Sequence, residues 1–196
     1  TEGSRTQEAN VDASNNIYLS SISSSSNFPT TVGAYQTASG GGNDGVVVKL
    51  DLTCSTLLAG TYLGGSSADE CQGVLIASNG DVIATGNTGS ANFPTTAGAH
   101  QTVFQGGTED GFVTKFNNDL TAQIASSYVG TTAGDEGYRA QIDIAGNIYV
   151  CGTSDNYSYP VSAGVYSNGA GRIFLHKFDN ALSTSLLSTK VGMDMG

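Results

Sequence analysis

The chain has 196 residues, of which 38% are hydrophobic and 12% are charged, with a net charge of -10 and a pI near 4.2. Its seven Lys and Arg residues are too few to neutralise a phosphate backbone, and no apolar run reaches the ~20 residues that span a bilayer, so we expect neither nucleic-acid binding nor membrane insertion. The 27 glycines, the absence of tryptophan and the low content of charged residues predict an all-β protein rather than one with long helices.

The first 65 residues contain four runs that are typical of β-strands. The run TQEANVDA from residue 6 and the run NIYLS from residue 16 flank a turn at Asn15, which favours a tight hairpin with positive φ. A long connection that contains NFPTTVGAYQT from residue 27 follows them. The runs VVVKLD from residue 46 and LLAGTYLG from residue 57 complete a predicted four-stranded unit.

The same order of elements recurs twice, with Gly80 and Gly146 in the hairpin turns. In residues 66–131 the strand-like runs are GVLIAS, DVIAT, FVTKFN and QIASSYVG, with NFPTTAGAHQT in the long connection. In residues 132–196 they are RAQIDIA, NIYVC, FLHKFD and SLLSTKVG, with SYPVSAGVYSN in the long connection. The three prolines, at positions 29, 94 and 160, are 65 and 66 residues apart. We therefore predict three repeats that span residues 1–65, 66–131 and 132–196.

Four antiparallel strands with short turns and one long connection are typical of a β-propeller blade. The segments NGDVIATGNT, NFPTTAGAHQT and DGFVTKF of the second repeat resemble the SBBP family of bacterial β-propeller repeats, and the resemblance covers essentially the entire chain. The third repeat departs from the pattern, with Arg172 where the others have Asp44 and Asp110, and with Lys190 where they have tyrosine. The resemblance implies a bacterial protein that is secreted or held at the cell surface.

Three blades are too few for a closed propeller, which typically has about four to eight. The sequence therefore predicts an incomplete propeller or a stacked array of β-sheet repeats. Because the outer sheets need cover in either arrangement, we expect the chain to associate with other copies of itself, or with further blades of the same protein, in a ring, an oligomer or a filament. We expect residues 190–196 to be buried against such a partner.

The residues that recur in every repeat favour structural roles over catalysis. Lys49, Lys115 and Lys177 occupy one equivalent position, and a group present in each blade usually serves packing or an ion pair. The acidic pairs at residues 69–70 and 135–136 fall on neighbouring positions whose side chains point to opposite faces of a strand. We expect these pairs to act in turns or between blades.

No catalytic or cofactor-binding motif is present in the sequence. The turns GGNDG and GGTEDG leave calcium as the one candidate metal, although neither has the EF-hand ligand spacing. His100 and His176 replace other residue types at positions of the repeat, so we interpret both as ordinary substitutions.

The long connections contain the candidate recognition residues, because insertions in repeat proteins collect on one face. These residues are Phe28, Pro29, Phe93, Pro94, Tyr159 and Pro160. The alternative, which we favour, is that each aromatic ring packs as a wedge beneath its own blade while the proline fixes the chain direction. The sequence N-Y-S at Asn156 is a candidate glycosylation site, and surface glycans are candidate partners.

The three cysteines do not recur between repeats, so the sequence predicts neither a disulfide framework nor a zinc site. Cys54 falls where the other repeats have Leu120 and Leu182. We therefore predict that Cys54 is buried and unpaired.

The leading functional interpretation is a non-catalytic extracellular module with a structural or adhesive role. The alternative is a fragment of a larger propeller enzyme or glycan-binding protein that has its site in the central channel. Repetition favours the first interpretation, because an active site needs unlike residues from different blades. We expect any export signal to lie outside this sequence or to have been removed.

Overall fold

The computed structural model describes residues 8–168 and 171–192, which form twelve strands and no helix. The strands make three antiparallel four-stranded sheets, each with its strands in chain order, and we call them blades 1, 2 and 3. Blade 1 contains β1 (Glu8–Val11), β2 (Ile17–Ser23), β3 (Asp44–Leu50) and β4 (Leu57–Leu63). Blade 2 contains β5 (Asp69–Ile76), β6 (Val82–Thr88), β7 (Asp110–Phe116) and β8 (Gln123–Val129). Blade 3 contains β9 (Asp135–Ile142), β10 (Ile148–Ser154), β11 (Ile173–Phe178) and β12 (Ser185–Val191).

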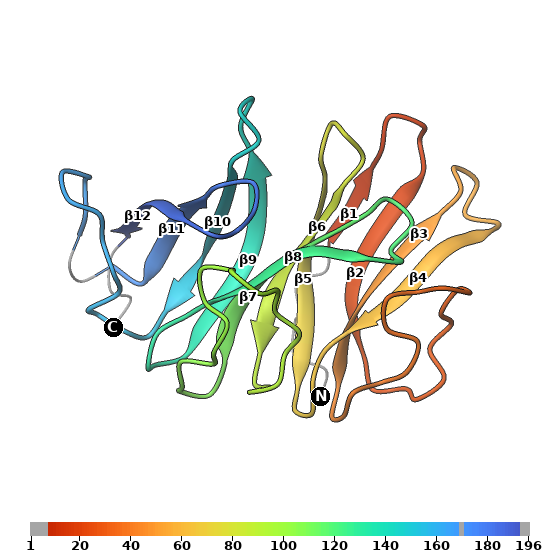
Figure 1. Ribbon diagram of the computed structural model, residues 1–196, viewed down its shortest axis with the longest axis horizontal. Helices are drawn as coiled ribbons and strands as arrows, with labels where there is room; N and C mark the ends of the chain where they lie inside the picture. The colour runs from red at the N-terminus through yellow and green to blue at the C-terminus, as the bar shows by residue number, and fades with distance from the viewer. Residues whose placement is uncertain (1–7, 169–170, 193–196) are drawn as a thin grey trace.

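The three blades lie side by side, with blade 2 in the middle (Figure 1). Their sheets do not close into a ring, which agrees with an incomplete propeller or a stack of sheets. The predicted all-β fold with three four-stranded antiparallel units is therefore confirmed. Each sheet lies within one of the three predicted repeats.

The turns repeat as closely as the strands do. Asn15, Gly80 and Gly146 have φ values of 63°, 91° and 83°, as predicted for the hairpins between the first two strands of each blade. The turns before the fourth strands contain a second left-handed residue, Cys54 or its equivalents, with φ values of 55–56°. In each of these turns that residue's N–H donates to the carbonyl group three positions earlier.

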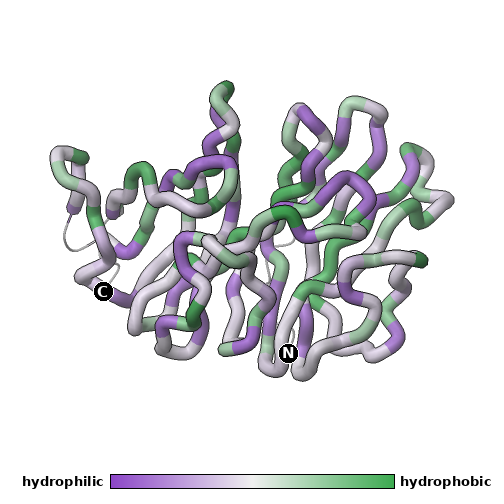
Figure 2. The backbone as a smooth tube through the Cα atoms, viewed as in Figure 1, coloured by the Kyte–Doolittle hydropathy of each residue, from purple (hydrophilic) through white to green (hydrophobic). Residues whose placement is uncertain are grey.

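The hydrophobic core lies between the blades, because a single sheet has no interior of its own. In blade 2, Val82 and Ala84 pack in a cluster with residues of blade 1, whereas Ile83, between them in the sequence, packs in a cluster with residues of blade 3. Both faces of blade 2 are therefore covered, and every residue of β6 and β7 is buried. Figure 2 shows apolar segments in the strands and both polar and apolar segments in the turns, which include exposed residues such as Val32 and Ile144.

Candidate functional site: the seams between blades

We call the contact between two neighbouring blades a seam, and the chain has two of them. In the first seam, β1, β2 and β3 pack against β5, the first strand of blade 2. In the second, β5, β6 and β7 pack against β9, the first strand of blade 3. Each seam thus joins three strands of one blade to the first strand of the next.

The recurring lysines fasten one blade to the next at the same point of each seam. Lys49 Nζ donates a hydrogen bond to Asn118 Oδ1 of blade 2, and Lys115 Nζ donates to Asn180 Oδ1 of blade 3 over 2.7 Å. Lys177 of blade 3 has no following blade in this chain, and its Nζ lies 2.9 Å from Asp143 Oδ2 of its own blade. In all three blades the register with the fourth strand shifts directly after the lysine. The lysines therefore have structural contacts.

A backbone hydrogen bond completes the same part of each seam. The N–H of Tyr35 donates to the carbonyl group of Leu120 over 2.9 Å, and the N–H of His100 donates to that of Leu182 over 2.7 Å. Both leucine side chains are 0% exposed because the preceding blade covers them.

The prediction that Cys54 is buried is wrong. Cys54 has the same left-handed turn as Leu120 and Leu182, but its side chain is exposed. The reason is its place in the chain, because blade 1 has no preceding blade to cover this turn. Cys54 is unpaired, as predicted.

Buried aspartates from the two blades meet at the opposite end of each seam. A Cβ atom added to Gly64 would clash with Asp44 Oδ1 and would lie 2.8 Å from Asp69 Oδ2, so carboxylate oxygens of two blades flank this glycine. Asp69 accepts hydrogen bonds from the N–H of Gly65 and the hydroxyl of Ser90, at 2.7 and 2.9 Å. Asp44 Oδ1 has no partner among the described residues. Asp69 therefore has the predicted inter-blade role, and so does Glu136 of the second pair, which accepts a hydrogen bond from Gln72 of blade 2 over 3.5 Å.

The second seam has the corresponding pair, Asp110 and Asp135, both 0% exposed. Burial, together with the smaller effect of the nearby Asp135 carboxylate, raises the pKa of Asp110 to about 7. Burial also raises the pKa of Asp135. In the described parts of the chain, no three His, Cys, Asp or Glu side chains come close enough together to hold a metal ion. Calcium stays the one candidate metal, and the expectation of no bound cofactor stays a prediction.

The second seam also contains a pocket in which several polar residues differ in type from those at the equivalent positions of the first seam. His176 Nδ1 lies 2.9 Å from the Tyr159 hydroxyl, and His176 Nε2 lies 2.7 Å from Ser185 Oγ. The ring of His100 lies 5.5 Å from that of His176, at the edge of a cavity of about 250 Å³. Burial lowers the pKa of His176 to about 3, so the imidazole is neutral at pH 7 and a weak base.

Sequence reasoning missed this grouping because it treated each histidine separately. In the first seam, Tyr35 stands at the position of His100, and Gln123 stands at the position of Ser185. The Tyr35 hydroxyl lies 3.2 Å from Gln123 Oε1. The sequence did contain one indication of this group. His100, His176 and Ser185 all differ from the residues of the other repeats, and all three lie at positions that face the second seam.

The aromatic rings of the candidate recognition loops pack as wedges. Phe93 is 3% exposed, with its ring 4.4 Å from that of Phe112. Tyr159 is 4% exposed and stacks on Phe174 at 4.8 Å. Phe28 on blade 1 is only half-buried. Because the rings of Phe93 and Tyr159 are buried, a partner that binds these loops would have to contact residues other than these two rings.

The prolines and Asn156 occupy more accessible positions in the same connections. Pro29 and Pro160 are exposed, while Pro94 and Asn156 are half-buried. The Asn156 side chain accepts a hydrogen bond from the N–H of Ser158 over 2.8 Å. Recognition by the loops and glycosylation of Asn156 stay predictions.

Lys190 replaces a tyrosine without losing its contact. In blade 2, the Tyr128 hydroxyl donates to the carbonyl group of Ser90 over 2.7 Å. In blade 3, Lys190 Nζ donates to the corresponding carbonyl group of Asn156 and to that of Tyr157, at 3.1 and 2.8 Å. Lys190 is 1% exposed inside its own blade. Its own blade, rather than another chain, therefore buries Lys190. Val191 is half-buried and Gly192 is exposed, whereas residues 193–196 lie outside the described part. Contact of this segment with a partner stays a prediction.

The two end blades each present an uncovered face. Ile83, Val113, Ala125 and Val129 of blade 2 face blade 3 and are at most 4% exposed. Their counterparts on blade 3, all only half-buried, are Tyr149, Leu175, Leu187 and Val191. On blade 1, the half-buried residues Ile17, Leu19 and Leu50 correspond to Val82, Ala84 and Phe116 of blade 2, each 0% exposed. We call these surfaces the open faces of blades 1 and 3.

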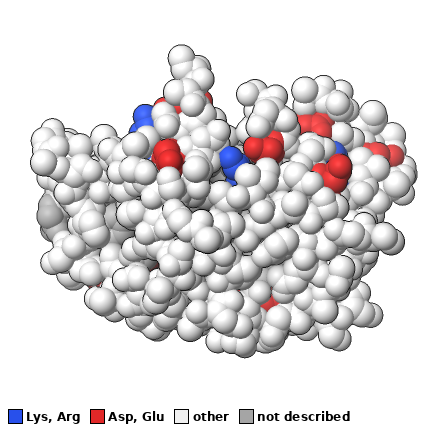
Figure 3. Space-filling view, viewed as in Figure 1, with Lys and Arg blue, Asp and Glu red and all other residues white. Residues whose placement is uncertain are grey.

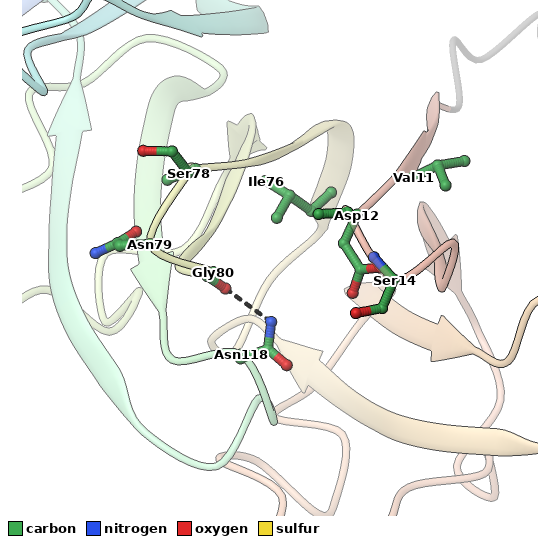
Figure 4. A pocket seen from close by; sticks show the side chains of 10 residues that line it. Val11, Asp12, Ser14, Ile76, Ser78, Asn79, Gly80 and Asn118 are labelled. Carbon is green, nitrogen blue, oxygen red and sulfur yellow. Dashed lines mark hydrogen bonds between the residues drawn. The ribbon is translucent and has the colours of Figure 1, made fainter.

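On the face drawn in Figure 3, most of the visible charged side chains lie along one rim. Figure 3 shows acidic and basic groups along the upper edge, where the turns of Figure 1 between the first two strands of each blade lie. A pocket of about 360 Å³ opens there between the β1–β2 and β5–β6 turns. The Asn118 side chain lines this pocket and donates a hydrogen bond to the carbonyl group of Gly80 over 3.0 Å (Figure 4). The same asparagine accepts from Lys49, so this polar rim is part of the seam.

No protein-family model matches the sequence, and no curated protein is significantly similar to it. The resemblance to SBBP repeats therefore stays a hypothesis. Among the described residues, no helix is long and apolar enough to cross a membrane.

Proposed function

We propose that this chain is a non-catalytic structural or adhesion module of an extracellular bacterial protein, and that it acts by associating through the open faces of blades 1 and 3. The extracellular and bacterial parts of the proposal rest on the SBBP-like motifs and on a surface rich in Ser, Thr, Gly and Asn with few cations. The association part rests on the open faces.

One observation carries the association part. Positions whose side chains are fully buried in the inner seams are half-buried at both ends of the chain. Leu175, for example, corresponds to Val113, which is 0% exposed. Covering apolar surface stabilises by roughly 25 cal/mol per Å², so a partner that covers an open face gains free energy from every such residue.

The chemistry of the polar groups supports a non-catalytic role. Ser185 and His176 are within hydrogen-bonding distance, which is the geometry of a nucleophile and its base. With its pKa near 3, however, His176 is a poor acceptor for the serine proton at neutral pH. Its other neighbour is the neutral hydroxyl of Tyr159 rather than a carboxylate that would stabilise an imidazolium ion.

A second candidate function is small-ligand binding in the cavity of the second seam. The observation in its favour is that His100, Tyr159, His176 and Ser185 meet there, although the first seam has no such group. Polar side chains beside aromatic rings suit a sugar-sized ligand. Calorimetric titration with monosaccharides, with the His100→Ala variant as control, tests this candidate.

To test the main proposal, an extra copy of the middle repeat can be joined to each end of the chain. If the open faces are association surfaces, the extended protein melts at a higher temperature, and the thiols of Cys54 and Cys151 react more slowly. Unchanged melting and unchanged thiol reactivity would contradict the association part. Turnover of glycoside, ester or phosphate substrates by the original chain would contradict the non-catalytic part.

A further inference from the structure

In the two inner seams, the following blade makes the same three contacts with the blade before it. The following blade supplies an asparagine side chain for the lysine, namely Asn118 or Asn180. Two residues later, it supplies a leucine carbonyl group for the N–H of Tyr35 or His100. Its first strand starts with an aspartate that faces an aspartate of the preceding blade.

The open face of blade 3 has residues at the positions that contact the following blade in the inner seams. Tyr166 takes the position of Tyr35 and His100 in the repeat and is 78% exposed. Lys177 takes the position of Lys49 and Lys115. Within the described ranges, the partners of its ammonium group belong to its own blade, namely Asp143 and the ring of Tyr149.

The third contact is altered in a way that favours an acidic partner. Arg172 stands where blades 1 and 2 have Asp44 and Asp110. Its guanidinium group is 46% exposed and pairs with Asp155, which is 57% exposed. A following blade that begins with aspartate would meet a cation here instead of a second carboxylate, which replaces repulsion by attraction.

Blade 1 of a second copy does not fit this face as well. Where blades 2 and 3 have Asn118 and Asn180, blade 1 has Leu52, which is 63% exposed. A head-to-tail contact between two copies would therefore bring the ammonium group of Lys177 against an apolar side chain. Desolvating a charge without supplying a new partner is unfavourable.

From these contacts we infer that the open face of blade 3 receives a further blade of this repeat type. The first strand of that blade begins with Asp, and the sequence Asn-x-Leu follows its third strand. Blade 1 of a second copy lacks this Asn-x-Leu sequence and is not the partner. The inference rests on the proposed function, because it names the partner of a proposed association surface. Blade 2 has the required residues in Asp69, Asn118 and Leu120, and it is the natural probe.

The test uses residues 1–192, with a copy of residues 65–131 in place of residues 193–196. Gly192 corresponds to Gly64, so this junction keeps the spacing of the inner seams. The control extension carries Asn118→Leu within the appended copy. Blade 1 has Leu52 at that position and forms its sheet, so the control blade is expected to fold.

The readout is the alkylation rate of Cys151, which lies on the open face at the position of the fully buried Thr85. Cys54 on blade 1 serves as the exposed reference and Cys71 as the buried one. We expect the matched extension to slow alkylation of Cys151 at least ~10-fold and the control extension to slow it several-fold less. In the unextended chain, the rates at Cys54 and Cys151 should not fall as the protein is concentrated.

Two outcomes would overturn the inferred partner but leave the open faces as association surfaces. In the first, the two extensions slow alkylation of Cys151 equally. In the second, alkylation of both Cys54 and Cys151 slows as the unextended protein is concentrated. Absence of protection by either extension would overturn the inference and the proposed association together.

Discussion

Lys49 of blade 1 donates a hydrogen bond to Asn118 of blade 2, a residue 69 positions later in the chain. The pair recurs one repeat further on as Lys115 and Asn180. A contact that recurs at the repeat length belongs to the geometry of stacking rather than to one blade. The third lysine, Lys177, has no such asparagine beside it among the described residues, and its Nζ lies 2.9 Å from Asp143 Oδ2 of its own blade.

Replacing Asn118 by leucine should destabilise the protein by about 2–3 kcal/mol. Asn118 accepts from Lys49, which is 7% exposed, and donates to the Tyr18 hydroxyl and the Gly80 carbonyl group. The substitution leaves a nearly buried ammonium group without this partner. Urea unfolding measures the loss. Asn79→Leu, in an exposed turn, should change the free energy of unfolding by less than ~0.5 kcal/mol.

Asp110→Asn should change how stability depends on pH. The pKa of Asp110 is about 7 in the folded protein against an ordinary value of 3.8, so the folded state binds the proton more tightly than the unfolded state does. The contribution of this group to stability is therefore greatest at low pH and falls as the pH rises from about 4 to about 7. The asparagine variant should be more stable than the original protein by roughly 1–3 kcal/mol at about pH 8, and the difference should shrink towards pH 5. Equal pH profiles of unfolding would contradict this.

Cys54→Asp should be tolerated, although Leu120→Asp at the equivalent position should not. Both residues have the same left-handed backbone, but Cys54 is exposed and Leu120 is 0% exposed in the first seam. We expect less than ~0.5 kcal/mol of destabilisation in the first case and more than ~3 kcal/mol in the second, measured by urea unfolding. Similar losses at the two positions would mean that blade 1 is covered.

Lys190→Met should cost about 1–3 kcal/mol, because the carbonyl groups of Asn156 and Tyr157 lose the donor that Lys190 supplies. Lys190→Tyr restores the residue that blades 1 and 2 use at this position. It should therefore retain more of the original stability. Thermal unfolding of the two variants gives the comparison, and a methionine variant as stable as the tyrosine variant would rule out the hydrogen-bonding role.

The strands and turns could be predicted from the sequence because each repeat served as a template for the others. Asn15, Gly80 and Gly146 marked the hairpins correctly, and the lysines occupy equivalent strand positions. The strand-like run FVTKFN from residue 112 also overlaps β7, whose residues are all buried. These features are local to one repeat, so comparison of the repeats was sufficient to find them.

Features that depend on the neighbouring blade could not be predicted in this way. Cys54 aligned with two buried leucines, but its burial requires a preceding blade that this chain lacks. Lys190 looked like a departure from the pattern, yet its long side chain supplies the same hydrogen-bond donor as tyrosine. The grouping of His176 with Ser185 required knowledge of which positions face the second seam.

The central claim is that the chain is a stack of blades with one open face at each end, and the reactivity of its three thiols tests it most directly. Alkylation of the dilute, folded protein, followed by peptide mass analysis, gives a rate for each cysteine. We predict fast reaction at Cys54, slower but measurable reaction at Cys151, and reaction at Cys71 only on unfolding, because Cys71 is 1% exposed and burial raises its thiol pKa. Protection of Cys151 to the level of Cys71 in a protein of 19.9 kDa would show that its face is already covered and would contradict the account.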